Sequence, residues 1–131
     1  MVLAKPLSRI LYVDDDASMR ELVRESLASQ ADMSVVTCMS GFEALIIVGQ
    51  LRPDLILLDV EMPRLDGMET LECLRAMELG HHPPVVFLAA GLSPPEIRRL
   101  QLAGAVDVIQ LPFDAAALPQ LIRSIWSRIA E

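Results

Sequence analysis

The sequence predicts an α/β domain, a doubly wound five-stranded parallel sheet with helices on both faces. Two observations support this fold class. Short apolar runs alternate with segments of helical periodicity along the chain. Two of these runs, 55–58 and 85–88, are apolar without interruption, which is typical of inner strands buried on both faces. Such alternation requires crossover connections, and these place helices over both faces of a parallel sheet.

The apolar runs come in chain order and are rich in β-branched and aliphatic residues. We expect strands at 9–13, 33–38, 54–59, 84–89 and 106–111. Each strand is followed by a segment whose apolar residues recur at helical spacing. We expect these segments to form helices at 17–30, 40–51, 65–79, 93–104 and 114–130.

Local signals support the helix assignments. The first helix carries apolar residues at positions 19, 22, 23 and 27, and the third carries them at 68, 71, 74 and 77. Ser40 and Ser93 are candidate N-caps, and Gly104 is a common helix stop. Pro119 falls in the last helix, which should therefore start late or lose one hydrogen bond. The expected inward stripe of that helix is Leu118, Ile122, Ile125 and Ile129.

Length and composition indicate one globular domain. The chain has 131 residues, 53% of them hydrophobic, and a mean hydropathy of +0.42, which is enough to fill a core. No apolar run approaches the roughly 20 residues that span a bilayer, and the N-terminus lacks the apolar stretch of a signal peptide. We therefore expect a cytoplasmic protein with no membrane association.

Charge narrows the range of partners. The net charge of −7 argues against direct nucleic-acid binding and is compatible with a cluster of acids that binds a cation. Lys5 is the only lysine among 11 basic residues. Cys38 and Cys73 fit no metal spacing, and we expect them to be small buried residues without a disulfide. The adjacent His81 and His82 are expected in a loop rather than at a metal.

Acidic residues follow two of the predicted strands. Asp14, Asp15 and Asp16 follow the first strand, and Asp59 ends the third. Carboxyl ends of parallel strands share one edge of a sheet, where ligands bind near the switch point of the strand order. If the two strands are neighbours, several carboxylates converge, and a hard divalent cation such as Mg²⁺ would relieve their repulsion. The simpler alternatives are N-capping by Asp16 and a turn begun by Asp59.

At these residues the chain resembles the receiver domain of bacterial two-component response regulators, over essentially its full length. Three segments carry the resemblance: "ILYVDDDASMR", "PDLILLDVEMPRLDG" and "LAGAVDVIQLPF". The second is the most specific, because the strand, the acid, Met-Pro and Asp-Gly all fall in register. The resemblance implies a flavodoxin-like (βα)5 fold and a single receiver domain at 1–131, with its core at about 8–130.

The resemblance also implies roles for individual residues. Asp59 would accept a phosphoryl group from the phosphohistidine of a histidine kinase or phosphotransfer protein. Asp15 and Asp59 would bind Mg²⁺ directly, Asp14 through water, and Glu61 through its backbone carbonyl. Pro63 and Gly67 would shape the following loop. Such a domain is a signalling phosphoacceptor rather than an enzyme, catalysing at most its own phosphorylation and dephosphorylation.

The chain departs from the family pattern at three positions. Leu111 stands where the family has a lysine, Ala89 where it has threonine or serine, and Val108 at the aromatic switch position. Neither Lys5 nor Ser93 is expected to substitute for the missing groups. Two hypotheses remain open: a phosphorylatable receiver with weak or unusual switching, and a degenerate pseudo-receiver that binds partners independently of phosphorylation.

Two surfaces are expected to meet partners, which would be a kinase and a downstream target or separate output domain. The first is the face of the fourth helix, fifth strand and fifth helix, through which a homodimer is also expected. Its residues would be Arg98, Arg99, Gln101, Asp107 and Arg123. The second is the first helix, where a kinase would dock near Arg20, Glu21 and Arg24.

Two further alternatives stay open. Trp126 could complete the rim of the core or anchor an interface. The segment "VDDDAS" also resembles the nucleophile loop of haloacid-dehalogenase-type phosphatases, with Asp14 as nucleophile. Hydrolysis of a phosphomonoester that depends on Asp14 but not on Asp59 would identify that enzyme class.

Overall fold

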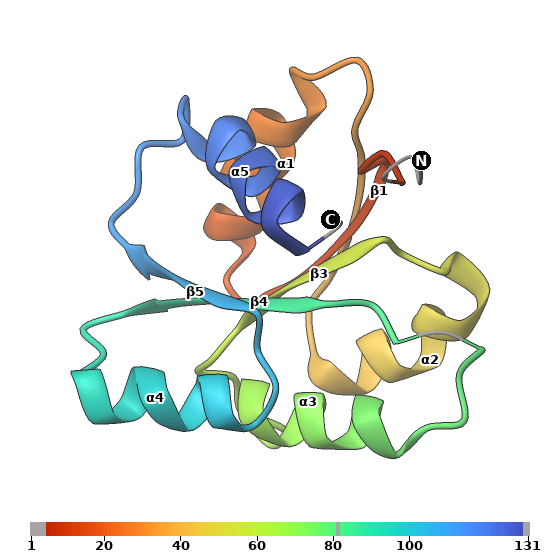
Figure 1. Cartoon of the computed structure of the whole chain (residues 1–131), viewed down its shortest axis with the longest axis vertical. Coiled ribbons are helices and arrows are strands. Elements are labelled where there is room, and N and C mark those ends of the chain that lie inside the picture. The colour runs from red at the N-terminus through yellow and green to blue at the C-terminus, as the bar shows by residue number, and fades with distance from the viewer. Residues whose placement is uncertain (1–4, 81, 130–131) are drawn as a thin grey trace.

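The computed structural model describes residues 5–80 and 82–129 and places them in three layers (Figure 1). The strands are β1 (Arg9–Val13), β2 (Ser34–Cys38), β3 (Leu55–Asp59), β4 (Val85–Ala90) and β5 (Asp107–Leu111). The helices are α1 (Ala17–Ala28), α2 (Gly41–Leu51), α3 (Gly67–Ala76), α4 (Pro94–Leu102) and α5 (Leu118–Ile129). All five strands are parallel in the order β2-β1-β3-β4-β5, so the predicted fold class is confirmed.

The sheet separates two apolar cores. One lies between the sheet and helices α1 and α5, and the other between the sheet and α2, α3 and α4 (Figure 1). The inner strands β3 and β4 contribute to both cores, and residues 55–58 and 85–88 are all buried. This burial on both faces is what their uninterrupted apolar runs predicted.

Capping residues begin the helices where the sequence indicated. The side chain of Asp16 accepts hydrogen bonds from two backbone N–H groups of α1, Ser40 caps α2 and Ser93 caps α4. Gly104, with φ of +115°, follows the end of α4 as expected. The last helix does start late, at Leu118, and the stripe of Leu118, Ile122 and Ile125 is buried.

The third helix is shorter than the predicted 65–79, and that prediction was wrong at both ends. Asp66 caps the helix in a capping box with Glu69, so helical structure begins only at Gly67. Met77 ends it with an extended backbone, although Met77 and Leu79 still pack against the core. The apolar periodicity therefore continued beyond the helix because it reports burial and not helical backbone.

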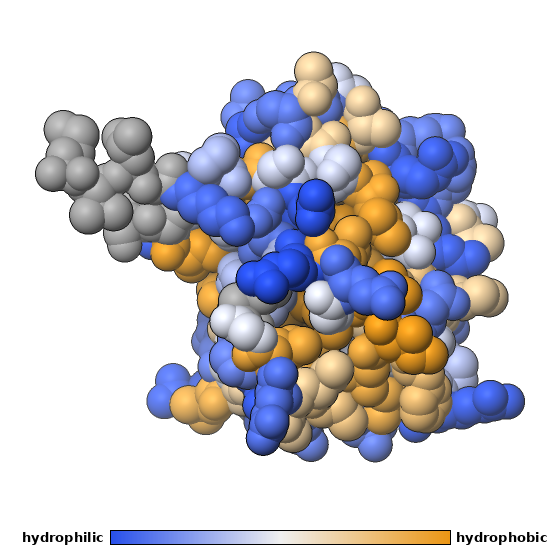
Figure 2. Space-filling view, turned by 90° about the vertical axis from the view of Figure 1, so that its right-hand side faces the viewer, coloured by the Kyte–Doolittle hydropathy of each residue, from blue (hydrophilic) through white to orange (hydrophobic). Residues whose placement is uncertain are grey.

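The outer face of α2 is apolar. Phe42 and Ile46 are 51% and 78% exposed, and Met39 just before the helix is 57% exposed. Apolar residues gather over the part of the surface in Figure 2 where α2 lies. Among the residues that the structure describes, no helix is long and apolar enough to cross a membrane.

Candidate metal and phosphoacceptor site

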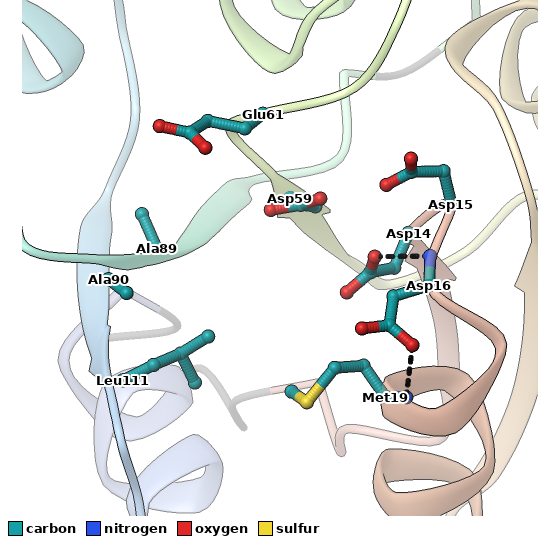
Figure 3. Close-up of a pocket in the computed structure, with 9 residues that line it drawn as sticks. All are labelled: Asp14, Asp15, Asp16, Met19, Asp59, Glu61, Ala89, Ala90 and Leu111. Atoms are coloured by element: carbon teal, nitrogen blue, oxygen red, sulfur yellow. Dashed lines mark hydrogen bonds between the residues drawn. The ribbon is translucent and has the colours of Figure 1, made fainter.

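The acids after β1 and at the end of β3 meet at one edge of the sheet. β1 and β3 are neighbours, paired from Ile10–Leu55 to Val13–Leu58. Asp14, Asp15 and Asp59 each place a carboxylate oxygen within 4.8 Å of the others. They open into a cavity of about 330 Å³ (Figure 3). Its lining residues are Asp14, Asp15, Asp16, Met19, Asp59, Glu61, Ala89, Ala90 and Leu111.

Asp14 is the buried member of the cluster, at 4% exposure. Its Oδ1 accepts the backbone N–H of Asp16 at 2.9 Å, and its Oδ2 accepts the hydroxyl of Tyr12. The guanidinium of Arg20 donates to the backbone carbonyl of Asp14 at 2.8 Å. These contacts fix both the side chain and the backbone of Asp14, which speaks against a role as an attacking nucleophile of the dehalogenase type.

Neither the hydrogen bond from Tyr12 nor the one from Arg20 to Asp14 was predicted from the sequence. The signal for Tyr12 was its position two residues before Asp14, since alternate residues of a strand point to the same face. Its hydroxyl can therefore reach the carboxylate that follows on that face. Burial and this hydrogen bond to Asp14 raise the pKa of the phenol far above its ordinary range, so Tyr12 is a hydrogen-bond donor at any physiological pH.

Asp15 and Asp16 are exposed, and their roles differ. Asp16 accepts the N–H groups of Ser18 at 2.8 Å and Met19 at 3.3 Å, so its capping role is confirmed. Asp15 faces the cavity beside Asp14 and Asp59 (Figure 3). Capping accounts for one acid of the three and leaves the other two available to a cation.

Asp59 lies half-buried at the tip of β3. Burial raises its pKa to about 7, and the charges of Asp14 and Asp15 act in the same direction. A hydrogen bond from the Glu61 backbone opposes the shift. The carboxylate is therefore held in an environment that disfavours its charge unless a cation is added.

The loop after β3 is folded tightly behind Asp59. The backbone N–H of Gly67 donates to the carbonyl of Val60 at 2.8 Å, and Val60 donates to Leu88 of β4 at 3.2 Å. Met62 is buried in the core below. A Cβ at Gly67 would lie 2.4 Å from the backbone oxygen of Asp59, so only glycine allows this approach.

The donor set fits Mg²⁺. Three carboxylates of different residues converge, and oxygen atoms are the ligands that this ion prefers. The raised pKa of Asp59 is a second indication, because burial and then the charges of Asp14 and Asp15 disfavour its ionised form in the absence of a cation. Asp14, Asp15, Asp59 and the backbone of Glu61 are the residues that would hold the ion.

The opposite wall of the cavity is apolar. Ala89 and Ala90 of β4 and Leu111 of β5 face the acids (Figure 3). Among the described residues that line the cavity, none carries an amine or a hydroxyl group. Lys5 forms an ion pair with Asp54 at 2.8 Å, and Ser93 is bound to Glu96 as a helix cap, so neither replaces the missing groups.

Comparison with known proteins decides the family. The family described as "Response regulator receiver domain" matches residues 10–123. The chain belongs to this family. Receiver domains act in two-component signalling as phosphoacceptors, generally bind Mg²⁺ in an acidic pocket, and interact with histidine kinases and output domains.

Curated relatives of the receiver domain are longer proteins. The response regulator MprA of Mycobacterium leprae is 42% identical over 120 residues, which are 92% of this chain and 51% of the relative. A protein-glutamate methylesterase/protein-glutamine glutaminase of Nocardioides is 33% identical over 123 residues, covering 92% of this chain and 33% of the relative. The chain therefore spans about half or less of the length of these relatives.

Solved structures share the fold. The chemotaxis protein CheY4 of Vibrio cholerae has a TM-score of 0.82 at 28% identity, covering 92% of this chain and 99% of that one. The response regulator domain of Thermotoga maritima CheB has a TM-score of 0.77 at 30% identity, covering 95% and 96%. These similarities confirm the flavodoxin-like fold expected for the receiver domain.

The two expected partner surfaces are partly occupied by contacts within the chain. Arg98, Arg99 and Gln101 are exposed on α4, but Arg123 pairs with Asp32 at 2.9 Å and faces the loop after α1. Its assignment to the face of α4, β5 and α5 was therefore wrong. On α1, Arg24 pairs with Glu21, whereas Arg20 is bound to Asp14.

Trp126, in α5, lies half-buried against the core between the sheet and helices α1 and α5. Its indole N–H donates to the carbonyl of Lys5 at 2.8 Å. This position completes the core rim.

Cys38 is buried, Cys73 is half-buried, and both are free thiols. His82 is exposed in a loop, and His81 lies outside the described residues.

The raised pKa of Asp59 predicts a pH-dependent stability of the metal-free protein. Because the folded state holds the Asp59 proton more tightly than the unfolded state, stability is lost as pH rises from about 4 to about 7. Asp59→Asn removes this loss, and we expect it to raise the free energy of unfolding at pH 8 by about 1–2 kcal/mol, a value discounted for solvent screening. Urea unfolding in EDTA measures it.

The same series contains its control. At pH 3, below the ordinary pKa of an aspartate, both proteins carry an uncharged side chain at this position in the folded and in the unfolded state, so their stabilities should agree. A gain from Asp59→Asn that is equal at pH 3 and pH 8 would contradict the electrostatic explanation.

Proposed function

We propose that Asp59 is the phosphoacceptor of this receiver domain and that Mg²⁺ binds at Asp14, Asp15, Asp59 and the backbone carbonyl of Glu61. The phosphoryl donor is the phosphohistidine of a histidine kinase or of a phosphotransfer protein. The convergence of three carboxylate oxygens within 4.8 Å at the end of β3 supports this proposal most strongly. The region from 1 to 131 acts as a single receiver domain, and the protein works in the cytoplasm.

In the transfer, an oxygen of Asp59 attacks phosphorus while the bond from phosphorus to the histidine nitrogen breaks. The buried strand β3 and the tight loop at Gly67 hold this oxygen at the open end of the cavity. Asp14 is immobilised by three hydrogen-bond donors and keeps its carboxylate next to Asp59. Bound Mg²⁺ supplies charge neutralisation for the carboxylates and the phosphoryl oxygens. The protein catalyses at most its own phosphorylation and dephosphorylation.

The apolar wall of the cavity favours a second candidate function. A phosphoryl group on Asp59 would meet Ala89 and Leu111, which offer neither a hydroxyl nor an amine. Without such contacts phosphorylation has little differential energy with which to shift a conformational equilibrium. The alternative is a degenerate pseudo-receiver whose surface binds its partner in the unphosphorylated state.

The same domain would contact a downstream target or a separate output domain. Arg98 and Arg99 of α4 are exposed, so they can contact a partner. The face of α4, β5 and α5 is therefore the best candidate for that contact and for a homodimer. The kinase would dock at α1, next to the cavity that Met19 and Asp16 border.

Intact-mass measurement after incubation with Mg²⁺ and acetyl phosphate tests the phosphoacceptor. The expected result is one phosphoryl adduct in the wild type and none in Asp59→Ala. Calorimetric titration with Mg²⁺ on the same samples reports the metal site separately. Asp114→Ala, at an exposed acid in the loop before α5, is the control for a general loss of charge.

The possible outcomes distinguish the two candidate functions and test the proposed site. An adduct that disappears in Asp59→Ala supports the phosphoacceptor. Mg²⁺ binding without an adduct, repeated with a phosphorylated phosphotransfer protein as donor, supports the pseudo-receiver. Failure to bind either Mg²⁺ or phosphate overturns the proposed site.

A further inference from the structure

Tyr12 is the single tyrosine of the chain, and it is completely buried. It lies in β1 with its ring in the core between the sheet and helices α1 and α5, where Leu57 is its partner in the neighbouring strand. Packing alone would be satisfied there by an aliphatic residue or by phenylalanine. The hydroxyl group is therefore the feature that requires an explanation.

The hydroxyl donates to Oδ2 of Asp14. Tyr12 and Asp14 point to the same side of the chain because they are two residues apart in an extended segment. The other oxygen of Asp14 is taken by the backbone N–H of Asp16. Each oxygen of the Asp14 carboxylate thus accepts a hydrogen bond from the protein, and the two bonds together restrict the rotation of the side chain.

We infer that Tyr12 is a positioning residue that orients the Asp14 carboxylate for cation binding at the phosphoacceptor site. This inference rests on the proposed function, since it concerns the same metal site. Tyr12 does not line the cavity and acts only through Asp14. Outer groups that orient the side chains around a metal commonly change its affinity by about 10–100-fold when they are removed.

A fixed carboxylate affects ions differently. Mg²⁺ requires a nearly ideal octahedral arrangement of ligands, whereas Ca²⁺ accepts irregular and variable arrangements. Loss of the Tyr12 hydroxyl removes one of the two donors that hold the Asp14 carboxylate. The looser carboxylate penalises Mg²⁺ more than Ca²⁺. Tyr12 therefore contributes to the preference of the site for Mg²⁺.

The test is Tyr12→Phe, which keeps the buried ring and deletes the hydroxyl. We expect the Kd for Mg²⁺ to rise about 10-fold and the Kd for Ca²⁺ to rise about 2-fold or less, by calorimetric titration. The matched control is Thr70→Val, which also deletes one fully buried hydroxyl, bound to the carbonyl of Asp66 at 2.8 Å. This control should leave both values unchanged.

The single tyrosine provides a second readout. Addition of Mg²⁺ should shift the near-ultraviolet absorption band of Tyr12 in the wild type, because its hydrogen-bond acceptor sits at the metal. If the wild type and Tyr12→Phe bind Mg²⁺ with the same Kd, this inference is overturned and the proposed site is not. Equal loss of Mg²⁺ and Ca²⁺ affinity in Tyr12→Phe and Thr70→Val also overturns it, since that pattern reports general destabilisation. A wild type that binds no Mg²⁺ overturns the proposed site together with the inference.

Discussion

Substitution of Leu111 by lysine, combined with Ala89→Thr, is expected to raise the rate of Asp59 phosphorylation by acetyl phosphate by about 10²-fold. Both positions line the cavity opposite Asp14 and Asp59 (Figure 3). A lysine there would add a charge-assisted hydrogen bond to the incoming phosphoryl group, and the threonine would add a hydroxyl donor. Removal of a single donor of this kind commonly costs about 10²–10³ in rate, so its restoration should recover much of that factor.

A control variant must separate the effect of the new positive charge at position 111 from the effect of a changed side-chain volume there. Leu111→Met changes the shape of the cavity wall without adding a donor, and we expect its phosphorylation rate to match that of the wild type. Asp59→Ala in the double variant should abolish the adduct. Rates are measured by intact mass over time at fixed Mg²⁺. A double variant that is no faster than Leu111→Met would show that the apolar wall does not limit phosphotransfer.

The same variants address what the protein does with a phosphoryl group. A ligand or modification can shift an equilibrium only by its difference in interaction energy with the two states. In the wild type, the side chains of Ala89 and Leu111 carry no polar atom that could contact the phosphoryl group. Partner binding that is equal before and after phosphorylation in the wild type, and unequal in the double variant, would identify the wild type as a constitutive binding module.

The sequence was sufficient for the layers of the fold and for the acidic cluster. Alternating strands and helices have few arrangements that obey the handedness of crossover connections. Once β1 and β3 are neighbours, the strand ends bring Asp14, Asp15 and Asp59 together. These features depend on periodicity and on chain order, which the sequence contains directly.

Side-chain contacts between distant or buried groups were not predictable in the same way. The pairing of Arg123 with Asp32 depends on how α5 lies against the loop after α1, and no periodicity encodes it. The role of Tyr12 is hidden because a tyrosine in an apolar strand is first explained by packing. The early end of α3 at Ala76 shows the same difficulty, since Met77 stays in the core without being helical.

Gly67→Ala is expected to be the most damaging single-methyl change in the loop behind Asp59. The new Cβ would lie 2.4 Å from the backbone oxygen of Asp59 and 2.8 Å from Cα of Val60, and neither atom can move without shifting the backbone. Overpacking of this kind costs about 1–3 kcal/mol. We expect a decrease of about 2 kcal/mol in the free energy of unfolding, measured by urea denaturation.

The functional cost of Gly67→Ala should exceed what stability alone explains. A shift of the Asp59 backbone displaces the attacking oxygen, and a misplacement of about 1 Å can cost about 10²-fold in rate. The matched control is Gly49→Ala in α2, where a Cβ would meet only Leu79 at an ordinary 3.9 Å. Alanine is favoured over glycine inside a helix by about 1 kcal/mol, so Gly49→Ala should be stabilising and leave phosphorylation unchanged. If Gly67→Ala destabilises the protein and slows phosphorylation while Gly49→Ala does neither, the close backbone approach at Gly67 holds Asp59 in place. Similar effects of the two substitutions would instead assign both to helix propensity.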